Sequence, residues 1–293
     1  MVDRVSSTQN SNGSKKQTYY LPSTPEERER LEIQHRMMLQ ILDHKYIKVP
    51  VDITTGTAIL ESGTGTGIWL MELSKTVTDG AELIGIDIVS KLFPARETLP
   101  PNVTFQTMSI LDLPTEWTNR FTLVNQRFLI AGLRYSEWVT AINNMCRVLK
   151  PGGWLQLLEP TGLMDAGPTG NIFHLLLERI RQLQGINGVF PNCGDVLKRL
   201  AEEAGFEEVT VTYYEAPVGK WGGDVGIQQR DILVQVLTAM KGVVLKNNGF
   251  GVVSGQEEGY EQFIYDWVKE VDEERKPMQP YAMICARKPI EGA

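Results

Sequence analysis

Short apolar runs alternate with amphipathic stretches along the first half of the chain. Apolar runs of strand length cover residues 58–61, 82–87, 103–108 and 121–127. Apolar residues recur at helical spacing over 25–43, 69–76 and 137–149. Strands that alternate with helices in this way predict a parallel sheet covered by helices on its faces.

The second half continues the pattern and then interrupts it. A turn at 150–153 leads into a fifth strand that ends at Glu159, and a loop is expected through Gly170. Helices are then predicted over 171–184 and 193–204, a strand over 206–214, helices over 229–246 and 256–274, and a last strand over 281–287. The chain therefore predicts a seven-stranded α/β sheet with a helical insertion at about 217–278.

Three segments differ in composition. Residues 1–17 are polar, rich in Ser and Asn, and read as a disordered tail. Residues 18–50 hold one predicted helix, which Ser23 or Thr24 can cap, and form an N-terminal helical cap segment. Residues 51–293 form the main domain. We expect the cap segment and the late insertion to act together as a lid over the site.

A glycine-rich loop follows the first predicted strand, in the sequence Glu61-Ser62-Gly63-Thr64-Gly65-Thr66-Gly67. In parallel α/β sheets a loop of this kind, at the carboxyl end of a strand, holds nucleotide-like cofactors. The loop does not match the dinucleotide-binding pattern G-x-G-x-x-G, because Ile68 stands at the position of the last glycine. A P-loop is excluded because no Gly-Lys-Ser/Thr ending is present.

An acidic residue ends the next predicted strand. Asp87 follows the glycine loop by about 20 residues, a spacing at which a carboxylate accepts hydrogen bonds from ribose hydroxyls. The pair of glycine loop and strand-end acid therefore indicates a ribose-containing cofactor. The alternative for Asp87 is a solvated turn residue.

Composition narrows the possible partners. The 293-residue chain has a net charge of −7 and a pI near 5.2, which argues against a nucleic-acid partner. Its three cysteines and three histidines are dispersed, so no metal site or disulfide framework is expected. Neither a signal peptide nor a membrane span is recognisable. We expect a cytoplasmic protein with no membrane partner.

The spacing acid-x-Gly-x-Gly-x-Gly resembles motif I of class I S-adenosylmethionine (SAM) methyltransferases. The turn Leu149-Lys150-Pro151-Gly152-Gly153 also resembles that family, and the likeness spans about 57–159. Outside this core, some segments resemble the methyltransferases of fungal secondary metabolism, including the LaeA-like family. These are Tyr20-Leu21-Pro22, Gln34-His35, Asn125-Gln126-Arg127 and Ala286-Arg287-Lys288-Pro289.

The resemblance implies a Rossmann-like class I methyltransferase fold and a set of SAM contacts. The methionine and ribose portions would meet the acid and glycine loop, the ribose would meet the second strand end, and the adenine would meet the turn after the third strand. Ser109 stands where the family usually has Asp. The implied cofactor residues are Tyr20, Glu61, Gly63, Thr64, Gly65, Gly67, Asp87, Ile88, Ser109, Ile110 and Asn125.

No catalytic base stands out. Glu159 at the tip of the fifth strand, His174 and His35 are the candidates, and each is equally interpretable as a packing residue. Arg127 could orient a substrate carbonyl or pair with a nearby acid. The substrate cavity is expected to be apolar, with Phe128, Phe173, Phe190 and Trp221 in its wall.

These features predict methyl transfer from SAM to a nitrogen or oxygen of a small hydrophobic natural product. The lack of an evident base favours nitrogen. Two alternatives stay open: a LaeA-like regulator of secondary metabolism, and a SAM-binding pericyclase that transfers no methyl group. The oligomeric state is also open, with a homodimer among the options.

Overall fold

The computed structural model describes residues 24–77, 80–186 and 189–290. Its centre is a seven-stranded sheet in the order β3-β2-β1-β4-β5-β7-β6, in which β7 runs antiparallel to both neighbours. The predicted Rossmann-like seven-stranded fold is confirmed. The strands are β1 (Ala58–Ser62), β2 (Glu82–Asp87), β3 (Val103–Thr107), β4 (Phe121–Arg127), β5 (Leu149–Pro160), β6 (Glu207–Pro217) and β7 (Met278–Arg287).

Helices precede, connect and follow these strands. They are α1 (Pro25–Ile41), α2 (Ile68–Leu73), α3 (Tyr135–Val148), α4 (Gly167–Gln184), α5 (Cys193–Glu203), α6 (Gly223–Lys246) and α7 (Glu257–Lys269). Short 3₁₀ turns occupy Ser90–Leu92, Arg96–Thr98, Thr115–Trp117, Lys220–Gly222 and Asn248–Gly251, and a π turn occupies Glu270–Glu274. The N-terminal end of α1 is capped as the sequence predicts, because Thr24 Oγ1 accepts a hydrogen bond from the Glu27 backbone N–H at 3.3 Å.

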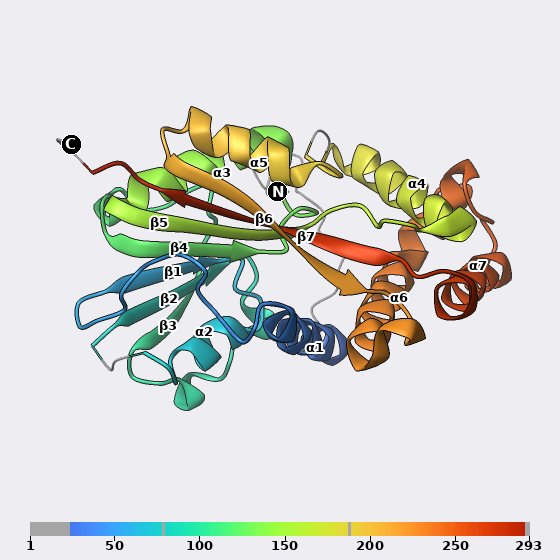
Figure 1. Cartoon of the computed structure of the whole chain (residues 1–293), viewed down its shortest axis with the longest axis horizontal. Helices are drawn as coiled ribbons and strands as arrows, with labels where there is room; N and C mark the ends of the chain where they lie inside the picture. Colours follow the sequence, from blue (N-terminus) through green and yellow to red (C-terminus); the bar gives the residue numbers. More distant parts are fainter. Residues whose placement is uncertain (1–23, 78–79, 187–188, 291–293) are drawn as a thin grey trace, which may run out of the picture.

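Alternation along the strands separates the two faces of the sheet. Ile59 packs with Trp69 of α2 on one face, whereas its neighbour Leu60 packs in the core that contains Trp138 of α3 and Leu197 of α5. All five side chains are buried. Figure 1 shows α3 and α5 over one face of the sheet and α2 near the other.

The helices α4, α6 and α7 lie together at one end of the sheet (Figure 1). They share an apolar core of their own, in which Phe173 of α4 packs against Trp267 of α7 with the ring centroids 5.5 Å apart and the ring planes tilted by 56°. Helix α1 packs beside α6 through a further cluster that contains Met37, Met38 and Ile232. Over the described residues, no helix combines the length and the apolarity that crossing a membrane requires.

Several predicted boundaries were wrong. The segment 150–153 is not a free turn before β5 but part of it. Phe121 pairs with Leu149 and Leu123 with Trp154, so the extra residues form a bulge in β5. Gly152 adopts φ +77° within this bulge. Helices α4 and α6 also begin earlier than predicted, at 167 and 223, with Pro168 in the first turn of α4.

Candidate active site

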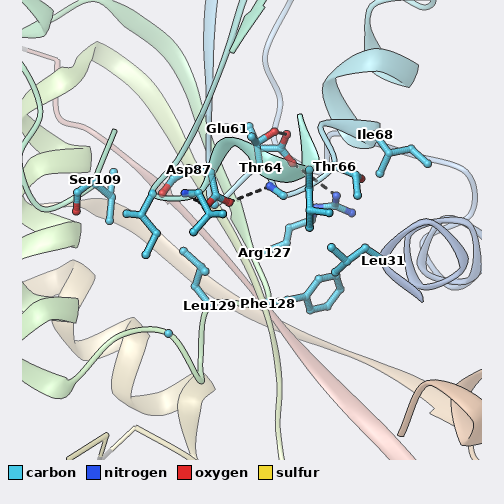
Figure 2. Close-up of a pocket in the computed structure, with 18 of the residues that line it drawn as sticks. Leu31, Glu61, Thr64, Thr66, Ile68, Asp87, Ser109, Arg127, Phe128 and Leu129 are labelled. Atoms are coloured by element: carbon cyan, nitrogen blue, oxygen red, sulfur yellow. Dashed lines mark hydrogen bonds and ion pairs between the residues drawn. The ribbon is translucent and has the colours of Figure 1, made fainter. Parts of the chain in front are cut away.

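A cleft opens where the parallel strands end, and we call it the glycine-loop cleft (Figure 2). Its walls come from the loop after β1, the ends of β2 and β4, the turn after β3, and the inner side of α1. β1 pairs in parallel with both β2 and β4, so the carboxyl ends of the three strands meet at one edge. Topology therefore brings together side chains that lie far apart in the sequence.

The glycines of the loop all adopt the left-handed conformation, with φ of 64° at Gly63, 54° at Gly65 and 74° at Gly67. Gly63 and Gly65 line the cleft, as expected, whereas Gly67 is not among its lining residues. A Cβ at Gly67 would lie 2.4 Å from the ring of Phe105. Gly67 is therefore required by packing against β3, and the structure offers no support for a direct cofactor contact there.

Glu61 ends β1 with a carboxylate that is only 2% exposed. Thr64 Oγ1 donates a hydrogen bond to it at 2.5 Å, and the Arg127 guanidinium lies 3.6 Å away. Burial raises the pKa of Glu61 to about 7, although the nearby positive charge of Arg127 opposes the shift. The cleft thus contains a buried acid, Glu61, whose carboxyl group changes its protonation state near neutral pH.

Asp87 lines the cleft from the end of β2, next to the exposed side chain of Ile88. One carboxylate oxygen accepts a hydrogen bond from the Gly65 N–H and the other accepts one from the Val89 N–H, both at 3.0 Å. Burial raises the pKa of Asp87, while these backbone donors favour the anion. Asp87 therefore fixes the glycine loop against β2, and binding of ribose hydroxyls there stays a prediction.

The turn after β3 contributes Ser109 and Ile110 to the cleft, next to Met108. Ser109 Oγ accepts a hydrogen bond from the Leu111 N–H at 3.2 Å, which leaves its hydroxyl proton free to donate to a ligand. Ile110 is almost fully buried and presents an apolar surface. A polar donor beside an apolar wall suits a heteroaromatic ring, as the sequence predicts for adenine.

Asn125 lies inside the sheet instead of in the cleft wall. It pairs with Glu61 of β1 and with Gln156 of β5, and its Oδ1 accepts a hydrogen bond from Gln156 Nε2 at 3.0 Å. Its side chain is 0% exposed. The sequence analysis placed Asn125 beside the cofactor, but β4 continues to Arg127, and Arg127 is the residue that reaches the cleft.

His35 belongs to a buried polar network that the sequence did not reveal. Its Nδ1 lies 3.2 Å from Arg127 Nη1 and its Nε2 lies 3.0 Å from Glu72 Oε2. Arginine can only donate, so Nδ1 accepts and Nε2 carries the proton that is donated to Glu72. Burial and the Arg127 charge lower the pKa of His35 to about 4. Both ring nitrogens are engaged, so His35 has no lone pair available for a substrate proton.

Glu159 also differs from its predicted role. The sequence placed its carboxylate facing the substrate, but Oε1 accepts a hydrogen bond from the Leu129 N–H and Oε2 one from the Ile130 N–H, each at 2.9 Å. Burial raises the pKa of Glu159 to about 8, against the effect of the two donors. It lines none of the cavities described here. The carboxylate holds the turn after β4, where Phe128 has a left-handed φ of 62°.

An apolar cavity adjoins the glycine-loop cleft and shares Leu31, Gln34 and Phe128 with it. Its volume is about 160 Å³, close to that of a cavity that holds one benzene ring. Phe173 lies in its wall as predicted. Trp221 does not line it, because that side chain is 38% exposed and its indole N–H donates to the Val218 carbonyl.

His174 lines the same cavity, yet its ring is committed to the backbone. The Leu163 N–H donates to His174 Nε2 at 2.8 Å, so the proton of the neutral ring is on Nδ1. Burial and the charge of Arg181 lower the pKa of His174. The ring is therefore a hydrogen-bond donor at Nδ1 rather than a base. In the part of the chain that the structure describes, no cluster of His, Cys, Asp and Glu side chains could hold a metal ion.

Tyr20 lies outside the described residues. Leu31, Gln34 and Glu72 were not predicted as residues of the site, although the helical spacing of the first two could have indicated them. They fall on the same side of α1 as Glu27 and His35, both of which also line the cleft. This spacing of three and four residues marks the helix side that faces the site.

Known proteins share both the core and the whole length of this chain. A family model described as a methyltransferase domain matches residues 59–153. N-methyltransferase sirN of Leptosphaeria maculans is 32% identical over 279 residues, which cover 92% of this chain and 95% of that protein. The chain belongs to the class I SAM-dependent methyltransferases. This methyltransferase thus has SAM as its cofactor, in agreement with the prediction from the glycine loop.

Further relatives support the same family. N-methyltransferase verN of Clonostachys rogersoniana is 33% identical to the methyltransferase over 208 residues, which cover 70% of this chain and 71% of that protein. Solved structures share the fold at low identity. The putative methyltransferase bound to the Haloferax volcanii Trm112 activator has a TM-score of 0.51 at 13% identity, covering 91% and 96% of the two chains. The [4+2]-cyclase SpnF has a TM-score of 0.50 at 20% identity, covering 87% and 81%.

Proposed function

We propose that the methyltransferase transfers the methyl group of SAM to a nitrogen atom of a small, largely apolar natural product. The observation that carries this proposal is the wall shared by the glycine-loop cleft and the apolar cavity, formed by Leu31, Gln34 and Phe128. Because these three residues border both spaces, a cofactor in the cleft and an acceptor in the cavity would lie next to each other. The names of sirN and verN as N-methyltransferases support nitrogen as the acceptor atom.

The side chains of the glycine-loop cleft fit SAM chemically. Glu61 is an anion suited to the ammonium group of the methionine portion, and Asp87 can accept from ribose hydroxyls beside Ile88. Ser109 and Ile110 provide a donor and an apolar surface for the adenine. We assign these roles to Glu61, Asp87, Ser109 and Ile110, with Thr64 orienting the Glu61 carboxylate.

When bound, SAM would supply a methyl group on a positively charged sulfur; an amine lone pair of the acceptor would form the N–C bond as the C–S bond breaks, and S-adenosylhomocysteine would be the leaving group. The protein then has to place the acceptor in line and exclude water, and it need not remove a proton before the attack. This requirement matches the geometry, because the three candidate bases are engaged elsewhere. His35 and His174 have no free lone pair, and both oxygens of Glu159 accept from the backbone.

We assign the covering role to α1 and to the helices between β6 and β7. Helix α1 contributes Leu31 and Gln34 to both cavities, and α6 contributes Gln229, Ile232 and Leu233 to the apolar cavity. These elements are the N-terminal cap and the late insertion of the sequence analysis. A cytoplasmic location and the oligomeric state remain predictions.

Two measurements test the proposal. Calorimetric titration with SAM should give saturable binding to the wild-type protein and much weaker binding to Glu61→Leu, because an apolar side chain removes the anion. Incubation with SAM and paired small aromatic amines and phenols, followed by mass spectrometry, should show amine products heavier by one methyl group. Methylation confined to the phenols would contradict nitrogen transfer.

The same spectra separate the alternatives. A product with the mass of its substrate but a changed retention time would favour a pericyclase. SAM binding without any product from a metabolite extract of the producing fungus would favour a regulator.

A further inference from the structure

A third cavity, the vestibule, continues outward from the apolar cavity. The two share Thr161, Leu163, His174, Arg181 and Phe190. The vestibule has a volume of about 900 Å³, whereas the apolar cavity has about 160 Å³. An acceptor larger than a single ring therefore cannot fit within the apolar cavity alone. The vestibule, which adjoins the cavity at the shared residues, has room for the remainder.

Arg181 of α4 is the charged group at this passage. Its guanidinium carbon lies 3.6 Å from the ring centroid of Phe190, so the cation stacks on an aromatic face. Its Nη1 is buried, and within the described residues this nitrogen has no hydrogen-bond partner. Burial lowers the pKa of Arg181 to about 10, which leaves the side chain charged at neutral pH.

A buried donor without a partner is unusual in a folded protein. Such a group costs free energy unless a protein atom, a water molecule or a ligand accepts its hydrogen bond. Glu178, one turn earlier on α4, is exposed, and its carboxylate accepts a hydrogen bond from Gln182 Nε2 at 3.0 Å, so it acts on Arg181 through its charge and not as the partner of Nη1. Arg181 lines both cavities at the passage, so a molecule bound there is the candidate acceptor for Nη1.

The surroundings select among possible acceptor groups. Glu178, Asp195 and Glu215 line the vestibule together with Arg181, so its carboxylates outnumber its arginine. A carboxylate entering this space would be repelled by those acids, and it would have to be desolvated as well. A neutral carbonyl oxygen accepts a strong hydrogen bond from a guanidinium without either cost.

We propose that Arg181 is a substrate-recognition residue that donates a hydrogen bond to a neutral carbonyl oxygen of the acceptor, at the passage between the apolar cavity and the vestibule. The acceptor accordingly carries a neutral amide, lactam or ketone carbonyl in addition to the amine nitrogen that is methylated, and its apolar part occupies the cavity lined by Phe128 and Phe173. This inference rests on the proposed function, because it describes the substrate of the same site.

The test compares three probes that share a 2-phenylethyl group and differ in the group at its end: 3-phenylpropanamide, 3-phenylpropanoate and propylbenzene. Each is titrated by calorimetry into the full-length protein saturated with S-adenosylhomocysteine. The variants are Arg181→Met and the matched control Arg179→Met. Arg179 lies on the same helix, but it is exposed and donates to Gln182 at 3.1 Å.

The amide should bind to the wild-type protein and to Arg179→Met at least about tenfold more tightly than to Arg181→Met, as expected for one hydrogen bond from a charged donor. Propylbenzene should bind all three proteins alike, and the carboxylate should bind the wild-type protein more weakly than the amide does. Equal amide affinities in the wild-type protein and Arg181→Met would overturn the proposal. Tighter binding of the carboxylate than of the amide, or no amide binding at millimolar concentration, would overturn it as well.

Two controls separate this inference from folding defects and from the proposed function. The Tm of unliganded Arg181→Met should be close to that of Arg179→Met, because a methionine side chain can still pack on the Phe190 ring and Nη1 has no protein partner to lose; a clearly lower Tm would assign Arg181 a structural role. SAM affinity should be the same in all three proteins. A wild-type protein that binds the amide through Arg181 but methylates no amine would contradict the proposed function alone.

Discussion

Substitution of Gly67 by alanine should destabilise the methyltransferase far more than the same change at Gly65. Both glycines have a left-handed φ, and an alanine there costs about 1 kcal/mol. At Gly67 the added Cβ would also lie 2.4 Å from the Phe105 ring, whereas at Gly65 the nearest atom is Leu31 Cδ1 at 3.4 Å. Overpacking of this kind costs a further 1–3 kcal/mol, roughly, so we expect a loss of about 3 kcal/mol for Gly67→Ala and about 1 kcal/mol for Gly65→Ala.

Urea denaturation measures the two losses, and calorimetric titration with SAM provides the second readout. Gly65 lines the cleft and Gly67 does not, so SAM affinity should fall more in Gly65→Ala, the more stable variant. Phe105→Leu supplies the matched test, because a smaller side chain makes room for the new methyl group. The double variant with Gly67→Ala should be about 1–2 kcal/mol more stable than the two single losses predict. Equal losses at both glycines, or no coupling to Phe105, would refute the packing explanation.

Three further outcomes follow from the site. The folded pKa of His35 is about 4 and its ordinary value is 6.5, so the unfolded chain binds the proton more tightly and stability falls as pH drops below 6.5. The full loss is about 3 kcal/mol at pH 4, and His35→Gln should remove this slope in urea midpoints measured from pH 7 to 4.5. Glu159→Gln should cost about 1–3 kcal/mol in urea denaturation, because an amide NH₂ then faces a backbone N–H, with kcat nearly unchanged; a hundredfold fall in kcat at unchanged stability would restore its role as a base. Arg127→Lys should raise the Kd for SAM about tenfold in calorimetry, since one ammonium cannot replace the fork between Glu61 and His35; an unchanged Kd would show that this fork is irrelevant to the cofactor.

The strand pattern and the glycine loop could be predicted because both are local. An apolar run followed by Glu61 and alternate glycines specifies a strand, a turn and a helix start within a few residues. Asp87 was found by its distance along the chain, and the structure places it in the same cleft. Topology alone brings these groups together once the strands are parallel.

The direction in which a side chain points could not be predicted in the same way. Glu159 does end β5, as expected, but its hydrogen-bond partners lie on the turn after β4. The roles of His35 and His174 depend on which ring nitrogen meets a donor, and those donors belong to other elements. The predicted beginning of α4 at about residue 171 was also wrong, because the helix begins at Gly167, with Pro168 in its first turn.

The antiparallel strand β7 has a consequence for the order in which the strands of the sheet can pair. β6 pairs with β7 and with no other strand of the sheet, and residues 218–277 separate the two along the chain. During synthesis, β5 and β6 therefore each keep an unpaired edge until β7, which follows α6 and α7 along the chain, has been translated. The described sheet reaches its full set of strand pairs only when its last strand has been made.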